Sequence, residues 1–279
     1  MPTTAARDQI REFLRSRRAR LTPQQVGLVE GGGLRRVPGL RREEVAELAA
    51  ISPEYYTQIE RGNVRGVSEV VLQTLMDALR LDAVERAYLL DLIRQANRRR
   101  GMPRHLPPLT IRPQLQQMLD AMSSVAINVR NDRLDLIGGN ARAKALFAPA
   151  WYMAPPNLAR HVFLDPATTT FSIDYDRIAD YAAGGLRVSV ARDPDDADLV
   201  ALIDELHGES ADFRARWKRH PVLRYGAGTQ RFRHPVVGEL HLQHESVKLV
   251  ADPGLTMVVY SAQPGTPTDE AFARLTTPQ

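Results

Sequence analysis

The stretch RRVPGLRREEVAELAAISPEYYTQIERG, residues 35–62, predicts two short helices joined by a tight turn. The first helix should begin near Arg41 and place Val45, Leu48 and Ala49 on one buried stripe, because residues three and four positions apart share a helix face. A turn through the next two residues ends this helix. The arrangement is typical of a helix-turn-helix, which favours DNA as the partner.

The second helix of the motif has a strong start signal. Ser52 is a good N-cap, and Pro53 occupies the first helical position, where a missing N–H costs nothing. Tyr56 and Ile59 should face the first helix, and Gly62 should end the second. The polar residues on the outward side should then enter the major groove. They are Glu54, Tyr55, Thr57 and Gln58.

The charge distribution supports a nucleic-acid partner. The segment 1–104 holds 19 arginines against 13 acidic residues, net +6, whereas the remainder is net −2. A basic surface of this kind suits phosphates, although two such helices could also belong to a protein-interaction bundle. Arg42 and Arg61 are expected on phosphates; the alternative is that either pairs with Glu43 or Glu60 on the bundle surface. The predicted DNA-binding residues are Arg41, Arg42, Ser52, Glu54, Tyr55, Thr57, Gln58 and Arg61.

Further helices surround the motif. Asp8–Arg17 should bury Ile10, Phe13 and Leu14; a helix capped by Ser68 should bury Val71, Leu75 and Leu79; and Glu85–Arg94 should bury Tyr88, Leu89 and Leu92. This pattern resembles the lambda-repressor-like, Xre-type DNA-binding domains, which implies an all-α five-helix bundle. The resemblance also implies that Glu54, Thr57 and Gln58 read base edges, with Gln58 suited to adenine. Ala50 departs from the family, which usually has Gly in the turn, and should be slightly strained there.

Length and composition bound the organisation. A chain of 279 residues suits two domains, and the basic, proline-containing stretch after residue 97 cannot continue a helix. No window approaches the apolar length needed to span a membrane, no signal peptide is apparent, and a cytoplasmic location is expected. The absence of cysteine excludes disulfides and thiolate sites. The predicted organisation is 1–97 DNA-binding domain, 98–110 linker, 111–265 ligand-binding and dimerisation domain, and 266–279 flexible tail.

Beyond the linker the pattern becomes mixed. A helix at 112–122, strands at 125–129 and 133–137 and a helix capped by Asn140 are followed by helices at 157–163, 175–190, 195–207 and 210–220. Strands near 230–234, 239–250 and 255–262 close the domain. The order predicts an α+β, PAS-like domain whose antiparallel sheet carries helices on one face.

A narrower resemblance covers residues from about 11 to 265. RRVPGLRREEVA, then YYTQIERG, then RHPVVGEL at 233–240, in this order and at these intervals, resemble the MmyB-like transcription regulators of actinomycete-type bacteria. The resemblance implies a homodimeric regulator with a small, apolar or fatty-acid-like ligand. Gly139 stands where the family usually has tryptophan, so the pocket should be enlarged or its wall moved. The residues implied in or near the pocket are Asn140, Phe163, Arg187, Trp217 and His234.

Most of these five residues have a structural alternative. Asn140 suits a helix cap, Phe163 and Trp217 suit a core, and His234 precedes a proline in a turn. Arg187 lies on an otherwise apolar helix, where its guanidinium needs solvent or an anion such as a ligand carboxylate.

An enzyme is the least favoured class. His241 and His244 should face opposite sides of one strand and cannot share an ion, and neither a zinc-protease motif nor a Gly-x-Ser-x-Gly elbow is present. We therefore expect no catalytic residue, no metal and no cofactor. The interpretation is a sequence-specific regulator of operator DNA whose C-terminal domain senses a ligand. The alternatives are a ligand-independent dimeric repressor with a purely structural C-terminal domain, and a DNA-tethered metal enzyme.

Overall fold

The computed structural model describes residues 4–28, 39–97, 110–223 and 225–275. It divides between α5 and α6 into two compact domains, each of which is described by itself. Residues 98–109, nearly all of the predicted linker 98–110, lie outside the described residues.

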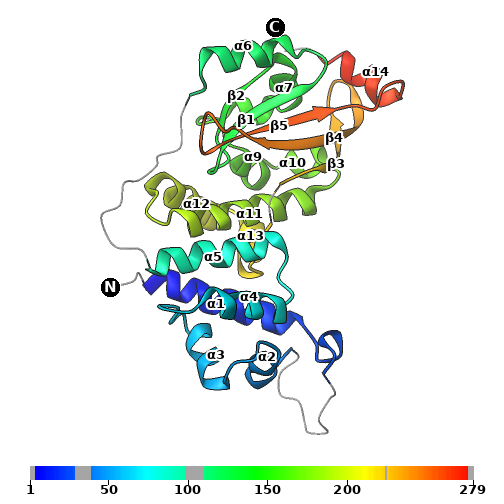
Figure 1. Cartoon of the computed structure of the whole chain (residues 1–279). Helices are drawn as coiled ribbons and strands as arrows, with labels where there is room; N and C mark the ends of the chain where they lie inside the picture. The colour runs from blue at the N-terminus through cyan, green and yellow to red at the C-terminus, as the bar shows by residue number, and fades with distance from the viewer. Residues whose placement is uncertain (1–3, 29–38, 98–109, 224, 276–279) are drawn as a thin grey trace. The chain divides into compact units, whose positions relative to one another are not determined.

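The N-terminal domain is all helical, as predicted (Figure 1, blue to cyan). The sequence periodicity is confirmed, because Ile10, Phe13, Leu14 and Tyr88 are all at most 1% exposed. The rings of Phe13 and Tyr88 meet edge to face at 5.1 Å and pack the first helix against the last. The elements are α1 (Thr4–Arg20), a 3₁₀ turn η1 (Gln24–Val26), α2 (Arg42–Leu48), α3 (Pro53–Glu60), α4 (Glu69–Ala78) and α5 (Ala83–Asn97).

The helix-turn-helix comprises α2 and α3. The Ser52 hydroxyl accepts a hydrogen bond from the Tyr55 N–H at 3.1 Å, so the predicted cap is confirmed. Ala50 adopts the left-handed conformation expected of the turn, with φ of 54°. Gly62 is required for two reasons: its φ is +82°, and a Cβ there would lie 2.7 Å from the Cα of Arg7 in α1.

The C-terminal domain is built on a five-stranded antiparallel sheet in the order β2-β1-β5-β4-β3. In the pairing of β4 with β5, His244 lies opposite Tyr260. The first strand of the domain, β1, pairs with the last strand, β5. The strands are β1 (Ala126–Asn131), β2 (Leu136–Gly139), β3 (Gly228–His234), β4 (Gly238–Lys248) and β5 (Leu255–Ser261).

Both faces of this sheet are covered, whereas helices on one face were expected. The inner face packs a cluster of buried aromatic rings, in which Phe147 meets Phe232 at 5.7 Å and Tyr260 at 5.2 Å. On the outer face, Leu115 and Leu119 of α6 (Pro113–Ala121) pack with Ile127 and other strand residues. β1 has apolar side chains on both faces, with Ala126 on the inner face and Ile127 and Val129 on the outer face. The alternation along one strand does not show which helix covers which face, so the prediction was wrong.

Helices between β2 and β3 form the rest of the domain. The sequence predicted α7, α9, α11, α12 and α13 to within a few residues, but not the short helices α8 and α10. The helices between β2 and β3 are α7 (Ala141–Leu146), α8 (Ala148–Tyr152), α9 (Leu158–Leu164), α10 (Thr168–Phe171), α11 (Tyr175–Arg192), α12 (Ala197–Glu209) and α13 (Ala211–Lys218).

The expected flexible tail 266–279 contains a further helix, α14 (Pro267–Ala273). Phe272 is 2% exposed and Leu275 is 4% exposed, and both belong to the core on the inner face of the sheet. The folded domain therefore continues at least to Leu275.

The space beside Gly139 is filled by a ring from another helix. A Cβ at Gly139 would lie 2.9 Å from the Ile127 carbonyl oxygen and 2.9 Å from Cζ2 of Trp151, in α8. Trp151 thus stands against the position at which the resemblance expected a tryptophan. Whether the pocket is enlarged or its wall is moved stays a prediction.

We predict that Gly139→Ala lowers the free energy of unfolding of the C-terminal domain by about 1–3 kcal/mol, because its Cβ overpacks against backbone. Urea unfolding followed by tryptophan fluorescence measures this, since both tryptophans, Trp151 and Trp217, lie in this domain. Gly208→Ala is the matched control. Its Cβ would meet nothing within 4 Å on helix α12, and alanine should stabilise it by roughly 0.5–1 kcal/mol. Equal effects of the two substitutions would contradict the packing assigned to Gly139.

Candidate functional site

The outward face of α3 is polar and accessible. Ser52, Glu54, Gln58 and Arg61 are exposed, and Tyr55 is 37% exposed. The opposite face is buried in the bundle. The second motif helix therefore presents the predicted residues together on one surface, as base readout requires.

Two of these side chains are already oriented by hydrogen bonds. The Asn63 amide nitrogen donates to the Gln58 Oε1 at 2.8 Å, and the Thr57 hydroxyl, which is half-buried, donates to the Pro53 carbonyl at 2.8 Å. Asn63 follows Gly62 directly, and sequence reasoning missed it. Its proximity to Gln58 depends on the left-handed turn at Gly62, which brings the chain back beside α3.

Arg42 is paired within the domain, and its expected contact with phosphate stays a prediction. Its Nε donates to Glu60 Oε2 at 2.5 Å, so the alternative, pairing with Glu60, describes its position. Glu60 also accepts from Arg18 Nε at 2.8 Å and from the Tyr56 hydroxyl at 3.1 Å. Burial alone would raise the pKa of Glu60, but the hydrogen bonds from Arg18 and Arg42 outweigh it and hold the pKa below its usual value. The carboxylate thus joins α1, α2 and α3.

Arg41 and Arg61 flank the motif on the surface. Both side chains are exposed, and the backbone N–H of Arg41 donates to Glu44 Oε2 at 2.6 Å, which closes the first turn of α2. Within the described residues, Arg61 makes no ion pair. Its guanidinium can therefore reach an external anion without breaking an internal contact.

Three of the five predicted ligand residues meet in the C-terminal domain. Phe163 lies 5.0 Å from the ring of Phe213, and Trp217 lies 5.2 Å from it. The Arg187 guanidinium stacks 4.1 Å above the Trp217 ring, and its Nη2 donates to the Trp217 carbonyl at 2.5 Å. The ring and the carbonyl of Trp217 thus both contact the Arg187 guanidinium, for which the sequence suggested a ligand carboxylate as partner.

Asn140 and His234 lie apart from that cluster and are engaged in structural hydrogen bonds. The Asn140 Oδ1 accepts from the backbone N–H groups of Ala143 and Ile127, and its Nδ2 donates to two carbonyls. No hydrogen bond of this amide remains for a ligand. The two ring nitrogens of His234 contact the Val236 N–H at 3.2 Å and the Ala145 carbonyl at 3.3 Å. Burial lowers the pKa of His234, which favours the neutral ring.

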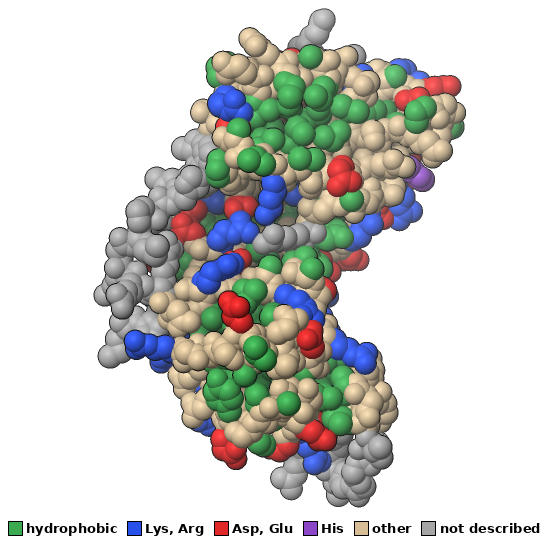
Figure 2. Space-filling model, viewed as in Figure 1, with side chains coloured by type: hydrophobic (Ala, Val, Ile, Leu, Met, Phe, Trp, Pro, Cys, Tyr) green, Lys and Arg blue, Asp and Glu red, His purple; other side chains and the backbone are tan. Residues whose placement is uncertain are grey.

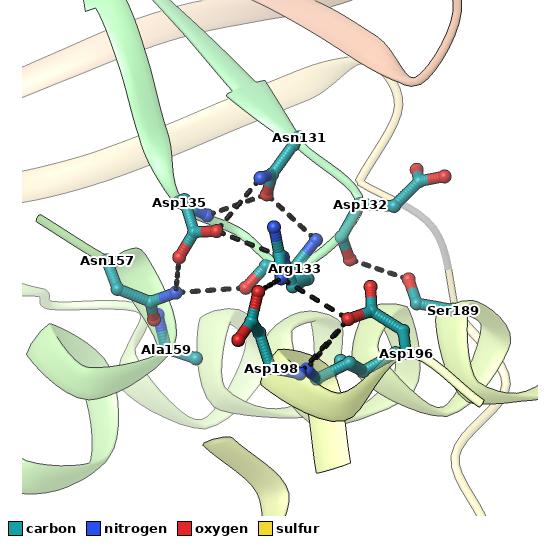
Figure 3. A network of polar contacts seen from close by, with 10 residues as sticks. Asn131, Asp132, Arg133, Asp135, Asn157, Ala159, Ser189, Asp196 and Asp198 are labelled. Atoms are coloured by element: carbon teal, nitrogen blue, oxygen red, sulfur yellow. Dashed lines mark hydrogen bonds and ion pairs between the residues drawn. The ribbon is translucent and has the colours of Figure 1, made fainter. Parts of the chain in front are cut away.

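A polar network that the sequence did not reveal ties the β1–β2 turn to three helices (Figure 3). Arg133 is 5% exposed and pairs with Asp135 at 3.3 Å, with Asp196 at 3.2 Å and with Asp198. Asn157, at the start of α9, donates to the Arg133 carbonyl at 3.0 Å.

The Asn131 side chain closes the β1–β2 turn by accepting from the backbone N–H groups of Arg133 and Asp135. The Ser189 hydroxyl of α11 donates to the Asp132 carbonyl at 2.6 Å. All of these contacts join parts of the protein to one another, so the network positions elements and leaves little capacity for a ligand. The only sequence signal was the polar run at 131–135, which is equally typical of an ordinary turn.

The two histidines of β4 point to opposite faces of the sheet. His241 is exposed and His244 is buried, which confirms that they face opposite sides of β4. No group of three or more histidine, aspartate or glutamate residues there could hold a metal ion. No helix among the described residues is long and apolar enough to cross a membrane.

Comparison with known families agrees with the two folds. Residues 9–89 match a helix-turn-helix domain, and residues 111–275 match the MmyB-like transcription regulator ligand binding domain. No curated protein matches the chain significantly. The second match covers more than half of the 279 residues and ends at Leu275. The chain belongs to the MmyB-like transcription regulators, as a DNA-binding helix-turn-helix domain followed by a ligand-binding domain.

Proposed function

We propose that this regulator acts in the cytoplasm as a homodimer, that α3 reads a specific operator, and that its C-terminal domain senses a small, mostly apolar molecule. The observation that carries the DNA part is the exposed polar face of α3 on a helix whose other face is fixed by Glu60. A rigid frame behind exposed base-reading groups favours specificity, because little order has to be gained on binding.

A ligand-independent repressor is the second candidate. It is favoured by the structural hydrogen bonds of Asn140 and His234 and by the packing of Phe163 in a core. In that case the C-terminal domain serves dimerisation alone. Native mass spectrometry of gently purified protein separates the two candidates, since only a sensor should retain an organic molecule.

Base readout is tested at Gln58 and Asn63. Gln58→Ala should lose roughly 1–3 kcal/mol on the preferred site and little on random DNA. Asn63→Ala should lose part of the same discrimination, since it frees the Gln58 amide to rotate. Binding-site selection with each variant measures this. Recovery of an unchanged consensus by Gln58→Ala would remove the glutamine from base readout.

Phosphate contact is tested by separating Arg61 from Arg42. Arg61→Ala should weaken all sequences alike and reduce the salt dependence by about one counterion. Arg42→Ala should instead lower stability by roughly 1–3 kcal/mol, because it removes a hydrogen bond from the buried Glu60 carboxylate. Arg233→Ala, an exposed arginine of β3, is the control. Fluorescence anisotropy over a salt series is the measurement, and sequence-selective loss at Arg61 would count against a phosphate role.

The outer face of the C-terminal sheet is our candidate for the dimer contact. Met118 on α6 is 41% exposed and Met122, the C-cap of this helix, is 39% exposed. Val247 on β4 is 43% exposed and lies opposite Met257 of β5. Partly buried apolar residues of β2 and β5, Ile137, Met257 and Val259, continue this surface. Figure 2 shows hydrophobic side chains gathered on the face of this domain. A two-fold contact through one shared patch suits a regulator that needs two half-sites about 34 Å apart.

We predict that the wild-type chain sediments as a dimer at micromolar concentration. Val247→Glu should raise the dimer dissociation constant at least about tenfold, because it places two like charges in an apolar contact. Val236→Glu, at an 81% exposed valine in the β3–β4 turn, should leave the dimer unchanged. A wild-type monomer that still binds operator tightly would refute the dimer, and a dimeric Val247→Glu variant would exclude this face.

A further inference from the structure

The inner face of the sheet changes character along its strands. At one end it packs phenylalanine rings against α7, α10 and α14. At the other end it carries polar side chains on three adjacent strands: Asn128 of β1, Tyr260 of β5, and His244 and Ser246 of β4. His244 is directly opposite Tyr260, and Val258 lies between Asn128 and Ser246. These four polar residues occupy neighbouring positions on one surface.

Several polar atoms of this surface have no partner among the described residues. Asn128 is fully buried, yet neither its Oδ1 nor its Nδ2 makes a hydrogen bond. The same holds for Nδ1 of His244, which is 6% exposed, and for Oγ of Ser246. Burial raises the pKa of Tyr260, and the neighbouring Tyr225, Arg130 and Asn128 oppose part of this shift. Asn128 is near Tyr260, but its side-chain atoms make no hydrogen bond to it. Buried polar atoms are rarely left unpaired, so such a group on adjacent strands calls for a partner.

The surrounding contacts hold these groups in place. The Tyr225 ring stacks on His244 at 4.1 Å, and its hydroxyl donates to Gln230 at 2.5 Å and lies 3.1 Å from the Tyr260 hydroxyl. The Arg130 guanidinium lies over the Tyr225 ring, 5.1 Å from the ring centroid. Tyr225 thereby fixes the His244 ring from one side.

The local field favours an oxygen acceptor over a cation. Burial, assisted by Arg177 and Arg130, lowers the pKa of His244 to about 4, so the ring is neutral at pH 7. Arg177 is shared with Asp174 at 3.2 Å, whereas no ion pair involves Arg130 within the described residues. A cationic group at this position would be repelled by Arg130 and Arg177.

We propose that Asn128, His244 and Ser246 form a polar subsite that binds an amide-like group, a carbonyl oxygen next to an N–H, on an otherwise apolar molecule. The subsite rests on the proposed ligand-sensing function and is separate from the five residues that the resemblance implied. The Asn128 amide offers one donor and one acceptor, which such a group matches in reverse. The Ser246 hydroxyl can donate or accept, and Nδ1 of the neutral His244 ring donates or accepts according to its tautomer. Val258, between Asn128 and Ser246, supplies an apolar contact.

The test uses two probes of similar shape, N-methyloctanamide and methyl octanoate. The amide has an N–H where the ester has an oxygen. Isothermal titration of the full-length wild type should show the amide binding at least about tenfold more tightly than the ester. Asn128→Leu should abolish that preference, and His241→Phe, on the exposed face of the same strand, should preserve it. Equal affinity of the two probes for the wild type, or an unchanged preference in Asn128→Leu, would overturn the subsite.

Stability provides a second readout. Because Asn128 makes no internal hydrogen bond, Asn128→Leu should raise the melting temperature of the unliganded protein by about 2–4 °C. A lower melting temperature would assign the amide a structural role and overturn the proposal. Operator binding is measured on the same samples. If the wild type binds no DNA sequence specifically but prefers the amide, the regulator function alone is refuted. If it binds its operator but shows no amide preference, the subsite alone is refuted.

Discussion

The buried carboxylate of Glu60 is the contact on which the DNA-binding surface depends. Glu60 is the last residue of α3, and its carboxylate accepts hydrogen bonds from Arg18 of α1, Arg42 of α2 and the Tyr56 hydroxyl. Removing a carboxylate from water costs several kcal/mol, so its position is stable only while both guanidinium groups remain. The requirement fixes α3 against two other helices and leaves its polar face free. An arginine that the sequence placed on phosphate thus stabilises the frame that presents Gln58.

The C-terminal domain uses a buried charge in the same way. Arg133 joins the β1–β2 turn to the start of α12 through Asp196 and Asp198, and Asn157 adds the start of α9. These contacts connect the helical layer to the sheet at one end of β1. The starts of α9 and α12 are thereby tied to the hairpin of β1 and β2. A ligand bound there would act on a connected unit, which is a physical condition for transmitting its presence.

The polar surface of Asn128, His244 and Ser246 contrasts with both networks. Glu60 and Arg133 are paired by several groups, whereas the atoms of this surface are buried without partners in the described residues. A folded protein tolerates such a departure from local consistency mainly at functional positions, because it lowers stability. Two of the five predicted ligand residues show the opposite, because the polar atoms of Asn140 and His234 all have partners within the protein.

The sequence by itself determined the helix-turn-helix, its caps, most of the remaining elements and the family, because periodicity, capping and turn residues act over a few positions. Tertiary structure decided which face of the sheet each helix covers, that Trp151 fills the space beside Gly139, and that Arg42 belongs to Glu60. It also decided that Asn63 orients Gln58. These outcomes depend on the distance between side chains far apart in the chain or across a turn, and on competition for a buried charge. Neither quantity is encoded in local spacing.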